Sequence, residues 1–336
     1  VKFLGDNFLH EEPYSTTLEQ MGIEILYGDH WATGLWDWLK LNKDEIDVAY
    51  LNRPHIATKY VDFIKENTNI KVIYYGHDLH FLREYREYEL TGDIQKKRES
   101  DYWKSIEFSL MEKAAVSYYP SYVEEEAIHA IHPEYKIKAI TAYVYEKFLE
   151  NIDKDFAKRE GLLFVGGFAH PPNADAVLWF AKEIFPLIRQ RIDVNFYVVG
   201  SKVTDEIKAL EQPGSGIIVK GFVTEEELAS LYSTSRIVVV PLRYGAGVKG
   251  KVVEAVYNGA AIVTTSIGSE GIPEADRVMK VADGPEAFAD EVVKMYQDPA
   301  ECRRMCEETQ KYIREYFSVE AAWKVIEEDF TPKKKR

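Results

Sequence analysis

Short runs of β-branched and aromatic residues alternate with longer amphipathic runs along nearly the whole chain. Residues 1–5, 47–51 and 71–75 have the composition of buried strands, and apolar residues recur at helical spacing between them. Because parallel strands need a long crossover connection, usually a helix, this alternation predicts βαβ units and parallel sheets. Ligands of such folds bind at the carboxyl ends of the strands. We therefore expect an α/β fold with its site at those strand ends.

The alternation pauses once, in the polar and charged residues 143–160, and then starts again. A chain of 336 residues also exceeds a single typical core, so two domains joined by this connection are expected. We predict an N-terminal Rossmann-like domain over residues 1–145 and a C-terminal one over residues 146–317. Residues 318–336 are predicted to form a last helix, able to pack back on the N-terminal domain, and a basic tail. Such domains face each other across a cleft.

Net charge and cysteine content exclude several classes of function. A formal net charge of −14 argues against a nucleic-acid partner, which needs clustered Lys and Arg. The one basic run, residues 333–336, favours a solvated terminus over a membrane anchor. Cys302 and Cys306 lack further zinc ligands nearby and fit free thiols of a reducing cytoplasm. With no membrane span or signal peptide in the sequence, we expect a cytoplasmic protein, with peripheral attachment to the inner membrane face as the alternative.

The stretch with the clearest chemistry is residues 238–271, VVVPLRYGAGVKGKVVEAVYNGAAIVTTSIGSEG. A buried strand leads into a glycine-rich loop and then into a helix, whose free N–H groups and dipole favour an anion. Lys249 and Lys251 add full positive charges that suit a diphosphate. Glu254, one turn into the helix, would face the same cleft and suits a sugar or ribose hydroxyl. An ordinary βα turn with solvated lysines is the alternative.

Two strand ends of the N-terminal half carry polar clusters. Asn52 and Arg53 follow one strand, and His77, Asp78 and His80 follow the next. His77 comes directly after a buried run and can donate to a ligand, while Asp78 could orient it or cap the following helix. A packed surface histidine is the alternative. His77 and His80 are three residues apart, but no further metal ligand lies nearby, so we predict no metal site.

Residues 79–113 are highly charged, and their apolar residues keep helical spacing, which predicts two long, partly exposed helices. Arg83 and Arg86 could reach the cleft from the first of them. Pairing on a solvated face is favoured, with the neighbouring Glu84, Glu87 and Glu89.

Several segments together resemble family 4, or group 1, glycosyltransferases. The C-terminal half carries FVGGFAHPPNADAVLWF at 164–180, VKGFV at 219–223 and PLRYGAGVKGKVVEAVYNGAAIVTTSIGSEGI at 241–272. In the N-terminal half, VIYYGHDLHFLREYREYELTGD at 72–93 is similar to the same family's segment after a strand. The family contains retaining enzymes of the GT-B fold, with two Rossmann-like domains around a central cleft. This variant resembles modules of larger bacterial glycan-assembly proteins.

The resemblance implies a nucleotide-diphosphate sugar donor on the C-terminal domain and a glycan, lipid-linked or protein acceptor on the N-terminal one. It also implies transfer of a hexosyl or deoxyhexosyl group without a metal or other cofactor. Lys249 and Lys251 would contact the diphosphate, Glu254 the ribose and His77 the donor sugar. The other implied donor-binding positions are Gly166, Gly167, Gly221, Phe222, Val223, Gly247 and Val248. The acceptor-side candidates are Asn52, Arg53 and Asp78.

Three departures from the family pattern qualify these expectations. Ala246 stands where the first Glu of the Glu-x7-Glu motif belongs, so either the sugar differs or its hold is weaker. The Arg and Lys that many members place after the first C-domain strand are absent, and Gly167, His170 and Asn173 occupy that region. The strand, Gly-rich loop and helix that normally open the N-domain are also missing. The last point leaves open that the sequence is a piece of a larger multidomain chain.

We expect glycosyl transfer with retention, in bacterial glycan, polysaccharide or glycoprotein synthesis. The lysines and the helix N-terminus would stabilise the leaving diphosphate as it gains charge. A catalytically silent GT-B module that binds a glycan or a partner is the alternative, favoured by Ala246 and the missing N-terminal unit. A nucleotide-sugar epimerase or a phosphorylase is a third, although the sequence offers no convincing pair of acid/base carboxylates.

Overall fold

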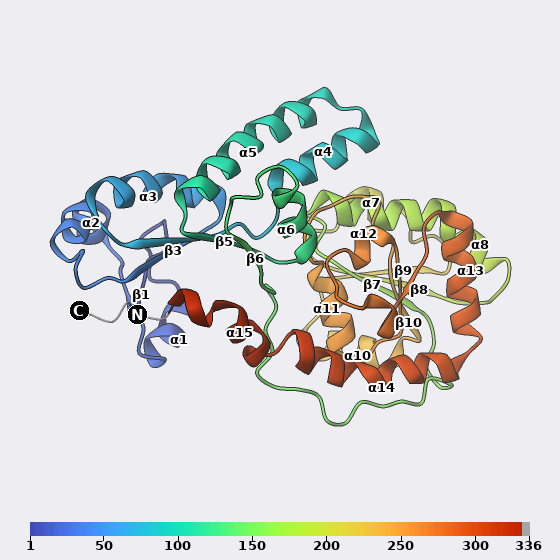
Figure 1. The fold of residues 1–336 in the computed structure, drawn as a ribbon. Coiled ribbons are helices and arrows are strands. Elements are labelled where there is room, and N and C mark those ends of the chain that lie inside the picture. The colour runs from blue at the N-terminus through green and yellow to red at the C-terminus, as the bar shows by residue number, and fades with distance from the viewer. Residues whose placement is uncertain (331–336) are drawn as a thin grey trace.

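A computed structural model describes residues 1–330, so the basic run at 333–336 lies outside the described residues. Within that range the strands form a six-stranded, a four-stranded and a two-stranded sheet. All of the strand pairs in these sheets are parallel. The two larger sheets lie in opposite halves of the molecule, each covered by helices (Figure 1). The expected α/β fold with parallel sheets is confirmed, whereas the domain boundaries stay a prediction.

The N-terminal half contains the four-stranded sheet and the two-stranded sheet. Its elements are β1 (Lys2–Phe3), α1 (Tyr14–Gln20), β2 (Glu24–Ile25), α2 (Asp29–Leu41), β3 (Val48–Asn52), α3 (Pro54–Asn67), β4 (Lys71–Tyr75), α4 (His80–Thr91), α5 (Ile94–Lys113), β5 (Val116–Tyr119), α6 (Tyr122–His129) and β6 (Ile137–Ala139). The larger sheet has the order β3-β4-β5-β6, and β1 pairs with β2 in the other.

Strand β4 brings the two polar clusters of this half together. Its sequence KVIYY has four buried residues, as expected of β-branched and aromatic residues in a sheet covered on both faces. Its register with β3 places Asn52 opposite Tyr75, the last residues of the two strands. The segments that follow Asn52 and Tyr75 therefore start side by side at one edge of the sheet.

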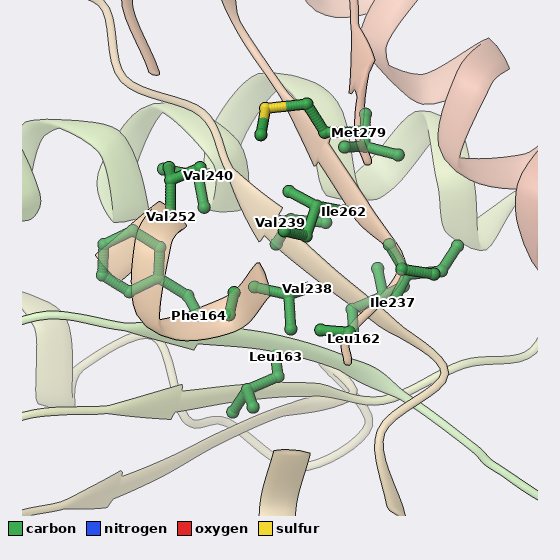
Figure 2. Close-up of a cluster of buried hydrophobic side chains, with 14 of the residues drawn as sticks. Leu162, Leu163, Phe164, Ile237, Val238, Val239, Val240, Val252, Ile262 and Met279 are labelled. Atoms are coloured by element: carbon green, nitrogen blue, oxygen red, sulfur yellow. The ribbon is translucent and has the colours of Figure 1, made fainter. Parts of the chain in front are cut away.

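The C-terminal half is built on the six-stranded sheet of order β12-β11-β10-β7-β8-β9. Its elements are β7 (Leu162–Val165), α7 (Pro171–Trp179), α8 (Phe185–Arg189), β8 (Phe196–Val199), α9 (Asp205–Lys208), β9 (Ile217–Gly221), α10 (Glu225–Thr234), β10 (Ile237–Val240), α11 (Gly250–Tyr257), β11 (Ile262–Thr264), α12 (Ser266–Ser269), β12 (Lys280–Val281), α13 (Pro285–Tyr296) and α14 (Pro299–Tyr316). The four residues of β10 are all buried and pack with β7, β11 and Val252 of α11 (Figure 2). This core fixes where β10 ends and α11 begins.

The apolar run at residues 173–191 forms a helix that is interrupted near its middle. Helix α7 passes into a π-helical turn, Phe180–Ile184, before α8 starts. Pro186 explains the break, because it has no N–H and cannot donate to the carbonyl of Lys182 four residues earlier.

The chain crosses between the halves twice. On the second crossing, α15 (Val319–Phe330) returns from α14 to the N-terminal half (Figure 1). There Asp329 accepts hydrogen bonds from Tyr118 at 2.7 Å and Lys138 at 2.6 Å. The two crossings touch where the Tyr145 N–H donates to the Phe317 carbonyl at 2.8 Å. None of the helices in residues 1–330 combines the length and apolarity that crossing a bilayer requires.

Candidate functional site

The glycine-rich loop between β10 and α11 has the backbone shape of an anion site. Gly247 has a φ of 72°, in the left-handed region that favours glycine. Helix α11 begins at Gly250; its N-cap residue, Lys249, makes no capping hydrogen bond, and the Tyr143 hydroxyl lies beside the Gly250 N–H. The backbone of Val248 lies in this loop, while its side chain is buried in the core. The loop therefore offers backbone groups to a ligand, together with the two lysines.

The two lysines have different surroundings. Lys249 is 8% exposed, donates to the Gly247 carbonyl and lies 3.4 Å from a carboxylate oxygen of Glu270. Lys251 is half-buried, and its ammonium has no hydrogen-bond or carboxylate partner among the described residues. Burial and the neighbouring Lys249 lower the pKa of Lys251 to about 8. Lys251 is thus still mainly cationic at pH 7 and lacks a counter-ion.

The end of β7 and the start of α7 approach Lys251. A Cβ on Gly166 would lie 3.1 Å from the Lys251 Cε and 3.0 Å from the Asn173 Nδ2, so glycine allows this close approach. Asn173 donates from Nδ2 to the Gly167 carbonyl at 2.7 Å, and its Oδ1 is buried without a partner in residues 1–330. Burial and Lys251 lower the pKa of His170, which precedes α7. An unpaired cation and an unpaired amide oxygen thus lie at one strand end.

Glu254 and Lys251 are three residues apart on α11, which places them on the same side of the helix. Burial raises the pKa of Glu254, and the nearby Tyr232 hydroxyl partly offsets this effect. The Tyr232 hydroxyl is itself buried beside the Glu254 carboxyl. Tyr145 and Tyr257 stack close by, with ring centroids 4.1 Å apart. Glu254 therefore sits in a half-buried pocket of tyrosines.

The positions implied for the nucleotide base lie at the end of β9, along the same sheet. Gly221 accepts a hydrogen bond from the Gly200 N–H at 2.8 Å, which ties the ends of β8 and β9 together. Phe222 is 80% exposed and Val223 is half-buried. None of the contacts within residues 1–330 joins these residues directly to the lysines.

His77 is held in a defined orientation at the end of β4. Its φ of 69° is in the left-handed region, uncommon for a residue with a side chain. Its Nε2 lies 2.9 Å from the Asn52 Oδ1, and because an amide oxygen only accepts, Nε2 carries the proton and Nδ1 can accept. Burial and the nearby Arg53 lower the pKa of His77 to about 4, so the ring is neutral at pH 7. The side chain of Arg53 is exposed, and its backbone N–H donates a hydrogen bond to the Tyr75 carbonyl at 2.9 Å.

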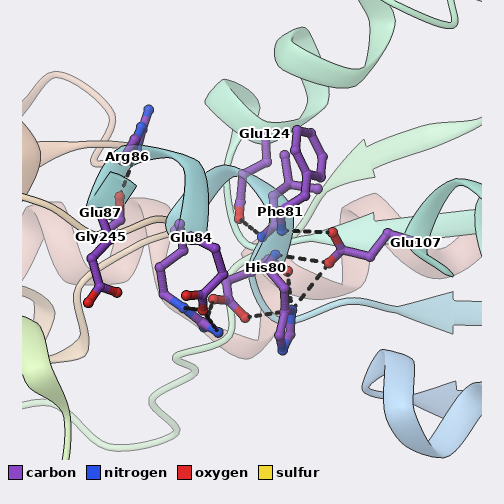
Figure 3. A network of polar contacts seen from close by, with 12 residues as sticks. His80, Phe81, Glu84, Arg86, Glu87, Glu107, Glu124 and Gly245 are labelled. Atoms are coloured by element: carbon purple, nitrogen blue, oxygen red, sulfur yellow. Dashed lines mark hydrogen bonds and ion pairs between the residues drawn. The ribbon is translucent and has the colours of Figure 1, made fainter. Parts of the chain in front are cut away.

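Asp78 does not cap α4, contrary to one of the two roles considered for it. It pairs with Arg83 and lies 3.3 Å from the His80 Nδ1. Two buried carboxylates from other helices cap α4 instead (Figure 3). Glu107 of α5 accepts from the N–H groups of His80 at 2.9 Å and Phe81 at 3.2 Å, and Glu124 of α6 accepts from Leu79 at 3.2 Å.

The glycine loop and the His77 segment meet across the two halves. A Cβ on Gly247 would lie 3.4 Å from the Asp78 Cβ and from the Glu124 Oε1, and 3.6 Å from the His77 carbonyl oxygen. Burial, with Asp78 close by, raises the pKa of Glu124 to about 8. The candidate diphosphate loop and the candidate sugar-side histidine thus belong to one site.

Sequence reasoning missed Glu107, Glu124, Glu270 and the role of Arg86. Glu107 lies between Trp103, Ile106 and Leu110 at helical spacing, a signal that it faces inward. Arg83 pairs with Glu84 as favoured, but Arg86 pairs with Glu270 rather than with the nearby glutamates. No local pattern links residue 86 to residue 270.

Within residues 1–330, no group of three or more His, Cys, Asp or Glu side chains is arranged to hold a metal ion. Cys302 and Cys306 are buried and unpaired. Burial raises the pKa of both thiols. They lie in the core of the C-terminal half.

Comparison with known proteins finds a family model that matches part of the chain and solved structures that share its fold. Residues 159–298 match the family model described as glycosyl transferases group 1. An uncharacterised 44.6 kDa protein in the cps region of Klebsiella pneumoniae is 30% identical over 142 residues, which cover 40% of this chain and 34% of that protein. The matched segment therefore spans about a third of the length of this curated relative.

Solved glycosyltransferases share the arrangement of both halves. Sucrose-phosphate synthase from Thermosynechococcus elongatus superposes with a TM-score of 0.71 at 14% identity, over 98% of this chain and 88% of the other. Anabaena HepE in complex with UDP and glucose superposes with a TM-score of 0.68 at 14% identity, over 95% and 89%. At such identities the likeness concerns the fold, and it confirms the expected GT-B architecture.

Proposed function

We propose that this chain, which carries a group 1 glycosyltransferase domain within a GT-B fold, is a retaining glycosyltransferase. It would move a hexosyl or deoxyhexosyl group from a nucleotide-diphosphate sugar to a hydroxyl of a glycan, lipid-linked or protein acceptor. The observation that carries this proposal is Lys251, an unpaired half-buried cation between the N-terminal ends of α7 and α11. A buried cation without a counter-ion is costly, and a bound diphosphate would repay that cost.

The charge of the leaving group explains how this site would act. As the bond between the sugar C1 and the phosphate oxygen breaks, negative charge grows on the departing diphosphate. Lys251 and the backbone N–H groups at the start of α11 stabilise that charge more in the transition state than in the ground state. The acceptor hydroxyl attacks C1 from the leaving-group face and gives its proton to the departing phosphate oxygen. We propose that these groups serve in place of a divalent metal.

His77 would orient the donor sugar. Its pKa of about 4 keeps the ring neutral at pH 7, and its proton on Nε2 is committed to Asn52. The remaining Nδ1 is an acceptor for a sugar hydroxyl. This favours an orienting role over that of a general base. Asn52, Arg53 and Asp78 lie on the same side and would contact the acceptor.

The nucleotide end would lie on the other side of Lys251. Glu254 would hold the ribose hydroxyls, and the backbone of Gly221 to Val223 would lie along the base. Anabaena HepE binds UDP and glucose in the same fold, so UDP is the first nucleotide to test on this chain. Bacterial glycan synthesis is the proposed setting because the relative in sequence is bacterial.

A thermal-shift screen with UDP, GDP, dTDP and their sugars tests the proposal directly. A nucleotide at 100 times its dissociation constant adds about 2.7 kcal/mol to the free energy of unfolding. The Lys251→Ala variant should lose this shift and also slow sugar transfer, by about 2–4 kcal/mol of barrier. A wild-type chain stabilised by none of these ligands would refute the proposal.

A catalytically silent module is the second candidate, and two observations favour it. The ammonium of Lys249 is already satisfied by Glu270 and the Gly247 carbonyl, while Ala246 removes a carboxylate from the donor site. The screen separates the two candidates, because a silent module that serves only as a glycan or partner platform binds no nucleotide. Transfer by the wild-type chain that stops in Lys251→Ala would exclude it.

A further inference from the structure

An arginine of the N-terminal half forms an ion pair with the C-terminal half. Arg86 lies on α4, and Glu270 follows α12. The Arg86 Nη1 and Nη2 lie 2.8 Å and 2.6 Å from the two carboxylate oxygens of Glu270, a bidentate arrangement. Their side chains are 23% and 10% exposed, so water screens this pair only in part. Among the ion pairs of residues 1–330, it is the one that joins residues 1–145 to residues 159–298.

The same two side chains hold the glycine loop. The Arg86 Nη1 also donates to the Gly245 carbonyl at 2.8 Å (Figure 3). Glu270 lies 3.4 Å from the Lys249 Nζ, at the far end of the loop. Arg86 therefore contacts the start of the loop directly and its end through Glu270.

The neighbouring arginine on α4 cannot take over this role. Arg83 is engaged within its own half by Asp78 and Glu84. Lys249, for its part, forms its one ion pair within 4 Å in the described structure with Glu270, and Glu124 lies further off. Removing Arg86 would leave Glu270 to Lys249 alone and free the Gly245 carbonyl.

We infer that Arg86 is a positioning residue for the donor site. Through Glu270 it holds Lys249 and the glycine loop in the arrangement that receives the diphosphate. Because Arg86 belongs to the opposite half, the loop is ordered in this way only when the two halves are closed. This inference rests on the proposed function, since it concerns the same diphosphate site.

The first test is UDP binding by isothermal titration calorimetry to the full chain and to Arg86→Gln. The expected result is a loss of UDP affinity of about ten-fold, the size of a typical coupling between sites. Arg86→Lys keeps the charge but not the bidentate geometry. We expect its UDP affinity to be reduced nearly as much as that of Arg86→Gln. The matched control is Arg191→Gln, which breaks an exposed pair with Asp290 inside the C-terminal half and should bind UDP as the wild type does. Unchanged UDP affinity in Arg86→Gln, with its circular dichroism intact, would overturn the inference.

A charge swap separates positioning from simple docking of the two halves. The double variant Arg86→Glu, Glu270→Arg can form the pair again, but it places a guanidinium rather than a carboxylate beside Lys249. We expect its radius of gyration in small-angle scattering to match that of the wild type while its UDP affinity stays low. Recovery of UDP affinity in the swap would mean that the pair only docks the halves. If the wild type itself binds no nucleotide, the proposed function fails. If the wild type binds UDP, the proposed function stands, and the variants test only the role of Arg86.

Discussion

Lys249 and Lys251 lie two residues apart, yet their ammonium groups meet opposite surroundings. Glu270 and the Gly247 carbonyl engage Lys249, whereas Lys251 has no such partner in residues 1–330. The sequence treats the two alike because both border the same loop. Glu270, which distinguishes them, lies far along the chain and reaches Lys249 only through the fold. We therefore assign most of the diphosphate-binding charge to Lys251.

The protonation of Lys251 should give UDP binding a decline at high pH. Burial and Lys249 lower its pKa to about 8, so its positive charge is lost as the pH rises through that value. We expect UDP affinity to fall about 25-fold from about pH 7.5 to about pH 9.5, since the charged fraction of a group with a pKa of about 8 falls by that factor over this range. Isothermal titration calorimetry over that pH range measures the UDP affinity. The Lys251→Arg variant stays charged and should flatten the decline; the same decline in both proteins would point to another group.

Gly166 is predicted to matter through the space that it leaves. A Cβ there would lie 3.0 Å from Asn173 and 3.1 Å from Lys251, so Gly166→Ala must displace one of these side chains. We expect UDP affinity to fall by about 1–3 kcal/mol, the usual cost of overpacking. Gly34→Ala is the control, because a Cβ on this helical glycine meets nothing within 4 Å and should stabilise α2 by up to about 1 kcal/mol. Equal UDP affinity in the two variants would show that UDP binding does not require a glycine at position 166.

At the scale of elements, helix α4 carries much of the site and depends on its neighbours. His77 and Asp78 precede it, and Arg86 projects from it to Gly245 and Glu270. Its first N–H groups are capped by Glu107 and Glu124, which belong to α5 and α6. The position of the His77 segment is therefore set by two buried carboxylates as well as by β4.

Removing the Glu107 carboxylate should destabilise the N-terminal half. Glu107 is fully buried, and Glu107→Ala would leave the N–H groups of His80 and Phe81 without an acceptor. Unsatisfied buried donors cost about 1–3 kcal/mol each, so we expect the free energy of unfolding in urea to fall by at least about 2 kcal/mol. Glu112→Ala, on the exposed face of the same helix, should change it by less than about 0.5 kcal/mol. Similar losses in both variants would argue against the cap.

Local sequence patterns predicted most helices and strands. The features that they did not predict depend on contacts with residues far along the chain. The buried runs of β4 and β10, and the helix that follows each, were readable because apolar periodicity is a local property. The π-helical turn at Phe180–Ile184 has no local signal in the sequence, because a proline does not reveal how the helix before it will adjust. The pairing of Arg86 was misjudged because near glutamates satisfy the same pattern as Glu270.

For the whole molecule, the site is made by the approach of two halves that are separate in sequence. The ends of β3 and β4 supply Asn52 and His77, while β7 and β10 lead to Gly166 and the glycine loop. The resemblance implied this division, but no sequence pattern gives the degree of closure. In the structure that closure brings Gly247 against Asp78 and pairs Arg86 with Glu270. Helix α15 adds a second attachment between the halves, on the sheet of the N-terminal half.

Asp329 should make the attachment of α15 dependent on pH. Burial raises the pKa of this carboxyl, but hydrogen bonds from Lys138 and Tyr118 outweigh burial, so its pKa lies below the ordinary value. A carboxyl with a depressed pKa stabilises the fold at neutral pH, and the contribution is lost as the pH falls through the folded-state pKa.

Asp329→Asn should therefore lower the free energy of unfolding in urea by about 1–3 kcal/mol at pH 7, and by progressively less below about pH 4. Asp290→Asn, which breaks an exposed pair with Arg191, should change it by less than about 1 kcal/mol. A loss in Asp329→Asn that stays as large well below pH 4 as it is at pH 7 would mean that the apolar contacts of Val325, Ile326 and Phe330, rather than this charge, hold α15 on the sheet.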